Sequence, residues 1–480
     1  NFLLPYLVWD MICYGDEDHF KHISNEIIGV LKMELSMHEQ VPQCQQVVFS
    51  LLDRLRKWVD LEEALVAKQK KRSAGKRLVS LVSEHVAKVR GLFECIPKVT
   101  LAKAALQCRA FQRALVNFEE EIRLSRTEAD GAESKLSSDE LAFLQRVYVG
   151  LGDADGLAGV ASTRVGAGLA RGEAALRAQI VDHEAAGRWV DATTCYGVLL
   201  QSMGGGGSQD NELNDGLMRC MRELGHFHAV LTHAQGTIKA CTTSSNKQAL
   251  HSGIIHAADA AWRLGEWDVM ADVQKHKEAD PTHLSVGIGN ILRRLEMFKR
   301  DDDDAGPMPS IIDECDAMRQ RIGRHLSAAC MESYERAYPW ICQLHQLQEL
   351  EHACRSSLFG GLEDAKSIIT AWDVRLGIMQ PQLQCREPVL GLRRALLQIS
   401  RNPAVSQAIG NTWIELAQTA RGAVLQTHGA ASDQLHTAAG ALMQQTAKEA
   451  ENFHIEKAKL SWAQNHRHQA ITELTAAIVR

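Results

Sequence analysis

Four short bends, each built around a glycine, recur along the middle of the sequence at nearly even steps. Gly152, Gly187, Gly225 and Gly265 lie 35, 38 and 40 residues apart. At the last one, in RLGEWDVMADV, apolar residues precede the glycine, an aromatic residue follows two places later, and apolar spacing then resumes. Glycine suits this position because the residue after a helix commonly takes a left-handed conformation. The spacing predicts a series of stacked helical hairpins, each hiding its neighbour's apolar face.

The segments around these bends carry further helical signals. In SSDELAFLQRVYVGLG, Ser137 and Glu140 have capping-box spacing. Five apolar residues then fall on one helical stripe, namely Leu141, Leu144, Val147, Tyr148 and Leu151. A bend without glycine is expected in ALQCRAFQRALVNFEE, and Asn465 stands in the glycine's place in SWAQNHRHQAITEL. No alternating pattern predicts a strand. We expect an all-α fold, an elongated α-solenoid of tetratricopeptide-like and HEAT-like helical hairpins.

The composition narrows the class of protein. Of 480 residues, 45% are hydrophobic and only 10 are proline, which favours helices. The formal net charge of −6 is small for this length, so we expect no direct binding of this region to nucleic acid or membrane. The 12 cysteines form no C-x-x-C pair, which favours free, mostly buried thiols in a reducing compartment. Both ends of the sequence look cut, as expected for a piece of a longer protein.

The acidic run Asp301–Asp304 is the strongest candidate for catalysis. Clustered carboxylates suit hard cations, as in helical enzymes that bind a magnesium-diphosphate group. Here the run leads directly into Gly306, Pro307 and Pro309, and proline breaks helices. Runs of like charge are also usually solvated. The sequence therefore favours an exposed connection over 301–310 and disfavours a magnesium-diphosphate enzyme.

Other candidate sites lack the partners that their chemistry needs. The spacing of three histidine pairs sends their side chains to different sides of a helix, and nothing completes a metal-ligand set; these are His226 with His228, His251 with His256, and His466 with His468. Gly166, Gly168 and Gly172 follow no predicted strand, so they lack the context of a phosphate-binding loop. The basic run Lys68–Arg77 fits a solvated linker better than a nuclear address or a nucleic-acid contact. We predict no catalytic, cofactor-binding or metal-binding residue in this chain.

A longer motif stands in LQCREPVLGLRRALL, from Leu383 to Leu397. Arg386-Glu387-Pro388 and the following LRRALL resemble a hallmark segment of the FAT region, the tetratricopeptide-like helical array of phosphatidylinositol-3-kinase-related protein kinases. Further segments resemble the same kinases in the expected order: PYLVWDMICY, EIIGVLKMEL, IPKVTLAKAALQCRAFQRALVNFEEEI, DGLAGVAS, DHEAAGRWVDATTCY, AAWRLGEWDVM, YERAYPWICQLHQLQELEHACRSSLF and EKAKLSWAQNHRHQAITEL. The match is closest to the checkpoint kinases of this family, and it is loosest over 407–445.

The resemblance implies a division of the chain into five parts. These are the end of a HEAT-type solenoid at 1–66, a basic linker and connecting helix at 67–94, the first FAT repeats at 95–300, the acidic and proline-containing loop at 301–310, and later FAT repeats at 311–480. The loops at Gly204–Gly207 and Asp301–Asp304 resemble local insertions. The resemblance implies a kinase domain outside this chain, so it carries no catalytic residue onto these residues.

The function implied by the resemblance is that of a non-catalytic scaffold in a nuclear serine/threonine kinase of the DNA-damage and replication-stress checkpoint. The implied partners are its own kinase domain, a partner subunit and activator proteins, in a homodimer of heterodimers. The resemblance implies ATP and magnesium for the absent kinase domain, and we expect no cofactor in this fragment. The alternative is a free-standing tetratricopeptide-type adaptor that binds peptides, although no periodic carboxylate clamp is evident.

Overall fold

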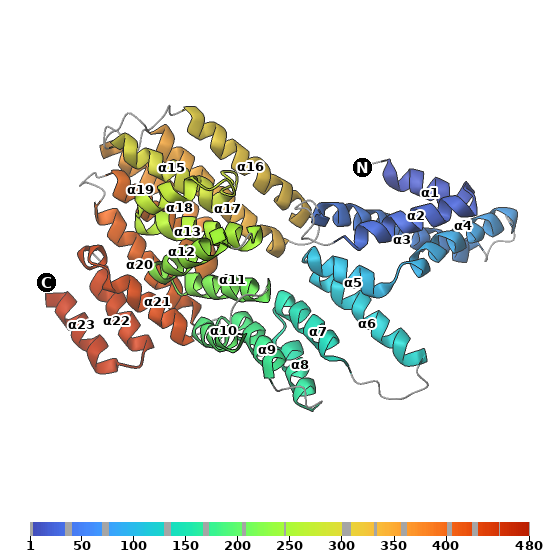
Figure 1. Ribbon diagram of the computed structural model, residues 1–480, viewed down its shortest axis with the longest axis horizontal. Helices are drawn as coiled ribbons and strands as arrows, with labels where there is room; N and C mark the ends of the chain where they lie inside the picture. The colour runs from blue at the N-terminus through green and yellow to red at the C-terminus, as the bar shows by residue number, and fades with distance from the viewer. Residues whose placement is uncertain are drawn as a thin grey trace. The chain divides into compact units, whose positions relative to one another are not determined.

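The computed structural model describes the chain over residues 3–33, 41–69, 76–128, 136–166, 172–203, 208–243, 246–299, 309–330, 334–356, 362–400, 406–424, 431–450 and 452–479. Over these residues all regular structure is helical, with no strand (Figure 1). The prediction of an all-α fold of helical hairpins is therefore confirmed. The chain divides into two compact units, the first holding α1 to α8 and the second α9 to α23.

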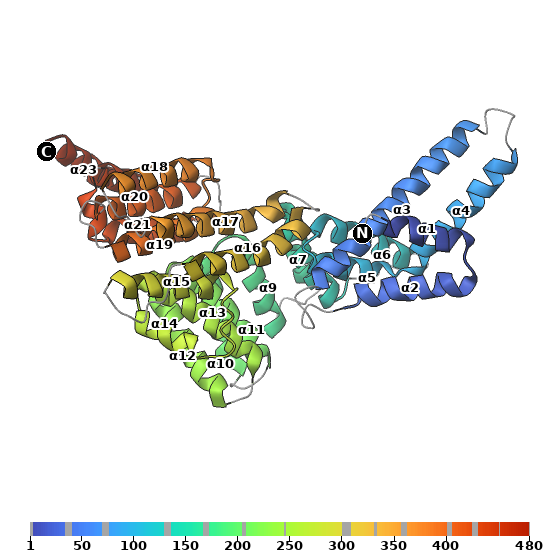
Figure 2. The same cartoon turned by 90° about the horizontal axis from the view of Figure 1, so that it is seen from above.

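The first unit contains α1 (Leu4–Tyr14), α2 (Glu17–Leu31), α3 (Val41–Gln69), α4 (Lys76–Cys95), α5 (Lys98–Gln107), α6 (Phe111–Glu128), α7 (Ser138–Leu151) and α8 (Ala154–Gly166). One continuous core joins all eight helices, with Val89, Leu92 and Cys108 fully buried near its centre. The helices α3 and α4 form a long antiparallel pair (Figure 2). Of the basic run Lys68–Arg77, the first two residues end α3 and the last two begin α4, and residues 70–75 lie outside the described part of the chain.

The second unit contains α9 (Gly172–Ala185), α10 (Trp189–Met203), α11 (Ser208–Glu223), α12 (Phe227–Thr243), α13 (Lys247–Leu264), α14 (Trp267–Gln274), α15 (Leu284–Lys299), α16 (Pro309–Cys330), α17 (Tyr334–Arg355), α18 (Leu362–Ile378), α19 (Leu383–Ser400), α20 (Ser406–Ala423), α21 (Ala431–Met443), the 3-10 helix η3 (Thr446–Glu449), α22 (Phe453–Ala463) and α23 (Arg467–Val479). Successive hairpins bury successive apolar clusters.

The connection predicted at 301–310 is too long by two residues, because Pro309 and Ser310 already belong to α16. Proline suits the first position of a helix since its missing N–H has no partner there. The acidic run itself lies outside the described residues.

The predicted bends are confirmed by their backbone conformation. Gly152, Gly187, Gly225 and Gly265 all have φ between 67° and 75°. Asn465 has φ 66°, as its place in the pattern predicts, and Arg109 takes the left-handed position at the bend that lacks glycine. At all six bends the N–H of the following residue bonds the carbonyl five residues back, in the pairs 110–105, 153–148, 188–183, 226–221, 266–261 and 466–461. This is the hydrogen bond of a Schellman motif, so one local device ends six helices.

The capping box predicted at the start of α7 is also present. The Ser137 side chain accepts a hydrogen bond from the Glu140 N–H, and the Glu140 carboxylate accepts one from the Ser137 N–H at 2.7 Å. Leu141, Leu144 and Val147 of the predicted stripe are buried. The cysteines are free thiols, most of them buried, as their spacing predicts. Local sequence signals therefore fix where these helices begin and end.

The left-handed bends yield a direct stability test. Gly225 has φ 75° with no atom close to the position of an added Cβ, so Gly225→Ala is expected to cost roughly 1–2 kcal/mol for backbone strain alone. Gly197 also has open space but lies inside α10, so Gly197→Ala is expected to be neutral or to stabilise by up to about 1 kcal/mol. Urea denaturation of both variants measures the contrast. Equal effects would show that the bend does not need a left-handed residue.

Candidate functional site

The motif helix α19 lies at the centre of the second unit. It packs against α13, α15, α17 and α20. Apolar residues alone do not account for its burial, since Arg393 and Arg394 are also buried along it. A buried guanidinium must be paired to offset the loss of its hydration. The contacts of the four charged residues of the motif therefore decide what α19 does.

Arg393 ties α19 to α17 and α18. Its guanidinium bonds Glu349 of α17 through Nε to Oε2 at 2.8 Å and through Nη2 to Oε1 at 2.7 Å. It also donates to the backbone carbonyl of Trp372 in α18. Burial raises the pKa of Glu349, while Arg393 and Arg375 pull it back down. The bidentate geometry holds the pair in one orientation and fixes three helices against one another.

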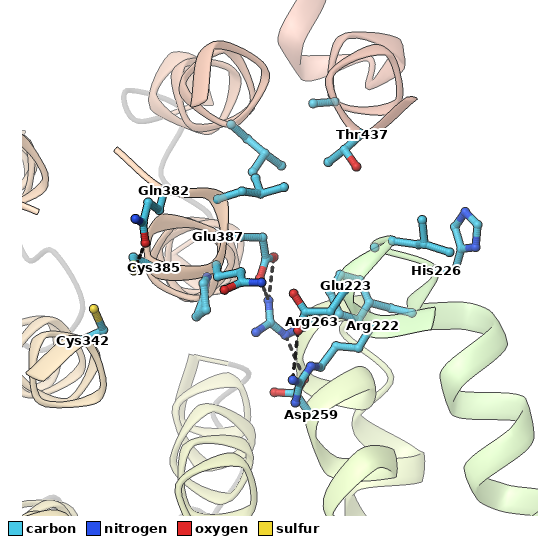
Figure 3. A pocket seen from close by; sticks show the side chains of 18 of the residues that line it. Arg222, Glu223, His226, Asp259, Arg263, Cys342, Gln382, Cys385, Glu387 and Thr437 are labelled. Atoms are coloured by element: carbon cyan, nitrogen blue, oxygen red, sulfur yellow. Dashed lines mark hydrogen bonds and ion pairs between the residues drawn. The ribbon is translucent and has the colours of Figure 1, made fainter. Parts of the chain in front are cut away.

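Glu387 ties α19 to α13. Arg263 Nη1 lies 2.7 Å from Glu387 Oε1 and 3.0 Å from Oε2, and Arg263 Nε lies 3.3 Å from Asp259 Oδ2 (Figure 3). Burial alone would lower the pKa of Arg263, but the two carboxylates raise it. Gly391 makes room for this bridge, because a Cβ at that position would lie 2.6 Å from Arg263 Nη1. A side chain at this position would therefore displace the Arg263 guanidinium from its present place.

Arg386 and Arg394 tie α19 to α20. Arg386 Nη1 pairs with Glu415 at 2.8 Å, and the Arg394 guanidinium stacks over the Trp413 ring, 3.9 Å from its centroid. Each charged residue of the motif thus makes a contact with another helix. The partners come from α13, α17 and α18, which precede α19 in the chain, and from α20, which follows it. We call Arg386, Glu387, Arg393 and Arg394, together with these partners, the α19 hub.

A cavity of about 1270 Å³ opens beside the α19 hub, within the second unit. Its wall is formed by α10 to α13, α15, α17 and α19 to α21, and Figure 3 shows the Arg263–Glu387 bridge within it. At the rim, the Val190 N–H donates to Asp433 Oδ2 at 3.2 Å across a sequence separation of 243. Helices α10 and α21 therefore meet, although they are far apart in the chain.

The other candidates from the sequence do not converge on a site. His226, His228, His466 and His468 are exposed. His251 Nδ1 lies 3.2 Å from the Glu278 carbonyl, and His256 Nε2 lies 3.1 Å from Asp215 Oδ1, so these two histidines have separate structural partners. Of the predicted glycine segment, Gly166 ends α8 and Gly172 begins α9, and residues 167–171 lie outside the described part of the chain. Among the residues that the structure describes, no group of three His, Cys, Asp or Glu could hold a metal ion. Over the same residues, no helix combines the length and apolar character needed to cross a membrane.

The Asp215–His256 contact predicts a pH dependence of stability. Burial would raise the pKa of Asp215, but hydrogen bonds from His256 and Ser252 and nearby positive charge lower it to about 2 from 3.8. A lowered pKa in the folded state stabilises above the ordinary value, and this contribution disappears as the pH falls toward about 2. Asp215→Asn is therefore expected to lose less free energy of unfolding than the unsubstituted chain over this acid range. Urea denaturation across the range measures it, with exposed Asp268→Asn as control. Parallel pH profiles would contradict the expectation.

The motif residues were visible in the sequence, but most of their partners were not. Glu349 and Glu415 stand in ordinary helical sequence with no signal of their pairing. Arg263 had one usable signal, because Asp259 precedes it by four residues and such pairs meet on one helix face. That spacing does not show that Glu387, 124 positions later, completes the pair.

Comparison with known families now gives the class of protein. The family model for the M-HEAT region of serine/threonine-protein kinase ATR matches residues 1–166, and the model for the FAT domain matches residues 256–479. The α19 hub therefore lies within the FAT domain match, and α1 to α8 lie within the match to the M-HEAT region. The predicted boundaries at 66, 94 and 300 stay predictions, because a family match does not define where a structural part ends.

Curated relatives match this chain along its whole length. Serine/threonine-protein kinase ATR of Oryza sativa subsp. indica is 30% identical over 100% of this chain, and that of Arabidopsis thaliana is 28% identical over 100% of it. Protein kinase rad3 of Schizosaccharomyces pombe is 21% identical over 99% of the chain. The chain spans only 18–19% of the length of these relatives. The chain belongs to the ATR family, and the predicted resemblance to these checkpoint kinases is confirmed.

Proposed function

We propose that the chain is the non-catalytic FAT scaffold of an ATR-like serine/threonine protein kinase that acts in the nucleus on DNA damage and replication stress. In this proposal it holds and restrains a kinase domain located elsewhere in the full-length protein. It also supports a homodimer of heterodimers and relays the binding of a partner subunit and of activators. ATP and magnesium are bound by the kinase domain and not by this region. The proposal rests on the family and on the α19 hub.

The α19 hub supports a mechanical role because separating its buried ion pairs would cost much of the free energy of unfolding. Arg393 and Glu349 are 3% and 0% exposed, so separating their helices would leave each buried charge with only a longer ion pair to α18, from Glu349 to Arg375 at 3.6 Å and from Arg393 to Asp373 at 3.5 Å. Removing one partner of such a pair destabilises a protein strongly, by about 3–5 kcal/mol. The contacts made by α19 therefore oppose movement of α13, α17, α18 and α20 relative to one another. A body that resists deformation in this way can transmit force or restrain a neighbouring domain.

The free-standing adaptor stays as the alternative, and the cavity is the one observation in its favour. The reading frame of the gene downstream of Arg480 separates the two functions. A lipid-kinase-like catalytic domain in that frame supports the scaffold, and a stop codon supports the adaptor.

The scaffold role predicts that the chain has no kinase activity of its own. Purified chain incubated with radiolabelled ATP, magnesium and a serine/threonine peptide is expected to transfer no phosphate, since no phosphate-binding loop or catalytic motif stands in its sequence. Transfer that follows the chain through two unrelated purification steps would contradict the assignment. Activity that separates from the chain at either step belongs to another kinase.

The restraint of the kinase domain is tested in the full-length protein. Glu387→Ala removes the carboxylate that joins α13 and α19, and exposed Glu266→Ala removes a carboxylate from the same unit as a matched control. Hydrogen exchange followed by mass spectrometry is expected to show faster exchange in the second unit and also in the kinase domain of Glu387→Ala only. Faster exchange confined to the second unit would show that this region does not restrain the kinase domain.

A further inference from the structure

Two of the free cysteines are neighbours in the wall of the cavity beside the α19 hub. Cys342 stands on α17 and Cys385 on α19, and these two helices pack together within the second unit. Both residues line the cavity and belong to one apolar cluster (Figure 3). Their thiols are close enough to share a hydrogen bond. Neighbouring thiols on packed helices can form a disulfide, provided that their Cβ atoms approach to about 3.5–4.5 Å.

The surroundings make the two thiols chemically different. A hydrogen bond from Cys342 and the positive charge of Arg386 lower the pKa of Cys385, although burial acts against them. The same hydrogen bond, together with burial, raises the pKa of Cys342. The thiolate is the reactive form of cysteine. Cys385 is therefore the nucleophile of the pair, and Cys342 is the thiol that stays protonated.

Polar side chains hold the two thiols in place. The Cys385 thiol donates a hydrogen bond to Gln382 Oε1 at 3.7 Å (Figure 3). Tyr338, one turn before Cys342 on α17, hydrogen-bonds the Cys342 thiol, and its hydroxyl accepts a hydrogen bond from the Gln380 N–H at 2.7 Å. Gln380 and Gln382 stand in the link between α18 and α19. The sulfur atoms are therefore positioned by contacts from α17 and from this link.

The cavity gives a small oxidant a route to this pair and not to another. Cys342 and Cys385 are 8% and 9% exposed, and a cavity of about 1270 Å³ has room for a molecule as small as hydrogen peroxide. Cys315 on α16 and Cys354 on α17 are 0% and 3% exposed, and neither lines this cavity. Burial raises the pKa of Cys315 to about 11 and that of Cys354 to about 12, so both thiols are expected to be inert.

We propose that Cys342 and Cys385 form an oxidative modification site, at which hydrogen peroxide converts the two thiols into a disulfide that joins α17 to α19. In the first step the Cys385 thiolate attacks one peroxide oxygen, the O–O bond breaks, and hydroxide leaves a sulfenic acid on Cys385. In the second step the Cys342 sulfur attacks the Cys385 sulfur, the S–O bond breaks, and the departing hydroxide takes the Cys342 proton. The two thiols lose two electrons, and one peroxide is reduced to two molecules of water. The proposal does not rest on the assignment to a kinase.

Peroxide treatment of the folded chain, followed by thiol blocking, digestion and mass spectrometry, tests the proposal. Trypsin with a glutamate-specific protease places Cys342 and Cys354 on different peptides, because Glu349 and Glu351 lie between them. The cross-link between Cys342 and Cys385 is expected to form at least about tenfold faster than any link between Cys315 and Cys354, since reactivity follows thiolate character and exposure. Dithiothreitol is expected to reverse it. Equal rates for the two pairs, or a cross-link that forms only in urea, would overturn the proposal.

Serine variants test the role assigned to each sulfur. In Cys342→Ser the sulfenic acid on Cys385 has no thiol to react with, so dimedone is expected to label Cys385 after peroxide treatment. In Cys385→Ser the Cys342 thiol is expected to stay reduced. Cys354→Ser, in the buried pair, is the matched control and is expected to leave the cross-link unchanged. Labelling of Cys342 in Cys385→Ser at the rate seen for Cys385 would contradict the proposed order of steps. The cross-link in the unsubstituted chain needs no variant to fold.

Discussion

Replacing Arg393 by alanine is expected to destabilise the second unit by about 3–5 kcal/mol. The reason is that the carboxylate of Glu349 would lose its main partner. Glu349 is fully buried, and without the guanidinium its carboxylate would lose two hydrogen bonds of 2.7–2.8 Å. Burial already raises the pKa of this carboxyl group, and without Arg393 the nearest remaining cation is Arg375 at 3.6 Å, so protonation of Glu349 becomes more favourable. Urea denaturation followed by circular dichroism measures the loss.

Two controls separate a lost charge pair from a lost contact. The double variant Arg393→Met with Glu349→Leu removes both charges and is expected to recover most of the stability, since buried ion pairs can be replaced by apolar residues at little net cost. The exposed pair Arg177–Glu173 on α9 has similar chemistry, and Arg177→Ala is expected to cost less than about 1 kcal/mol. A single Arg393→Ala variant as stable as Arg177→Ala would contradict the role assigned to the α19 hub.

Replacing Trp262 by alanine is expected to cost about 3–5 kcal/mol through loss of burial and formation of a cavity. Trp262 is 1% exposed and packs between α13, α15 and α19, where its ring also lies under the Arg263 guanidinium at 4.6 Å. Its removal would therefore loosen the apolar cluster and the Arg263–Glu387 bridge together. Trp462, which is 58% exposed on α22, is the matched control, with an expected loss below about 1 kcal/mol for alanine. Similar losses at both positions would show that the repeat junction is not built as described.

Local signals were sufficient to predict where helices end. The left-handed residues at Gly187, Gly225, Gly265 and Asn465 could be found because a Schellman motif needs a particular backbone conformation, and few residue types adopt it. Arg109 shows the limit of this approach. It has φ 57° although arginine has no preference for that region, so only the tertiary structure places it there.

Burial was harder to predict than helix position. Trp189 and Trp267 occupy the aromatic position two residues after a bend glycine, yet they are partly exposed, whereas Trp262 and Trp372 are buried. Periodicity identifies the apolar face of a helix but not how deeply its neighbours cover it. The latter depends on which helices are stacked at each position, and that information is not local.

For a similar reason, only the motif residues of the α19 hub could be predicted, and their partners could not. The segment from Arg386 to Leu397 could be identified as a motif, but sequence gave no measure of how close Glu349 and Arg263 come to it. Pairings over 44 and 124 positions depend on the superhelical path of the intervening hairpins. The cavity follows from that same path, so no single segment encodes it.

Hydrogen exchange of the chain with Glu349→Ala tests most directly whether α19 integrates the second unit. Peptides from α13, α17, α18, α19 and α20 are expected to exchange faster together, because all five helices share the contacts that Arg393 and its neighbours make. Peptides from α3 and α4, in the other unit, are expected to keep their unsubstituted rates. Faster exchange limited to α17 and α19, with α13 and α20 unchanged, would show a local ion pair in place of a hub.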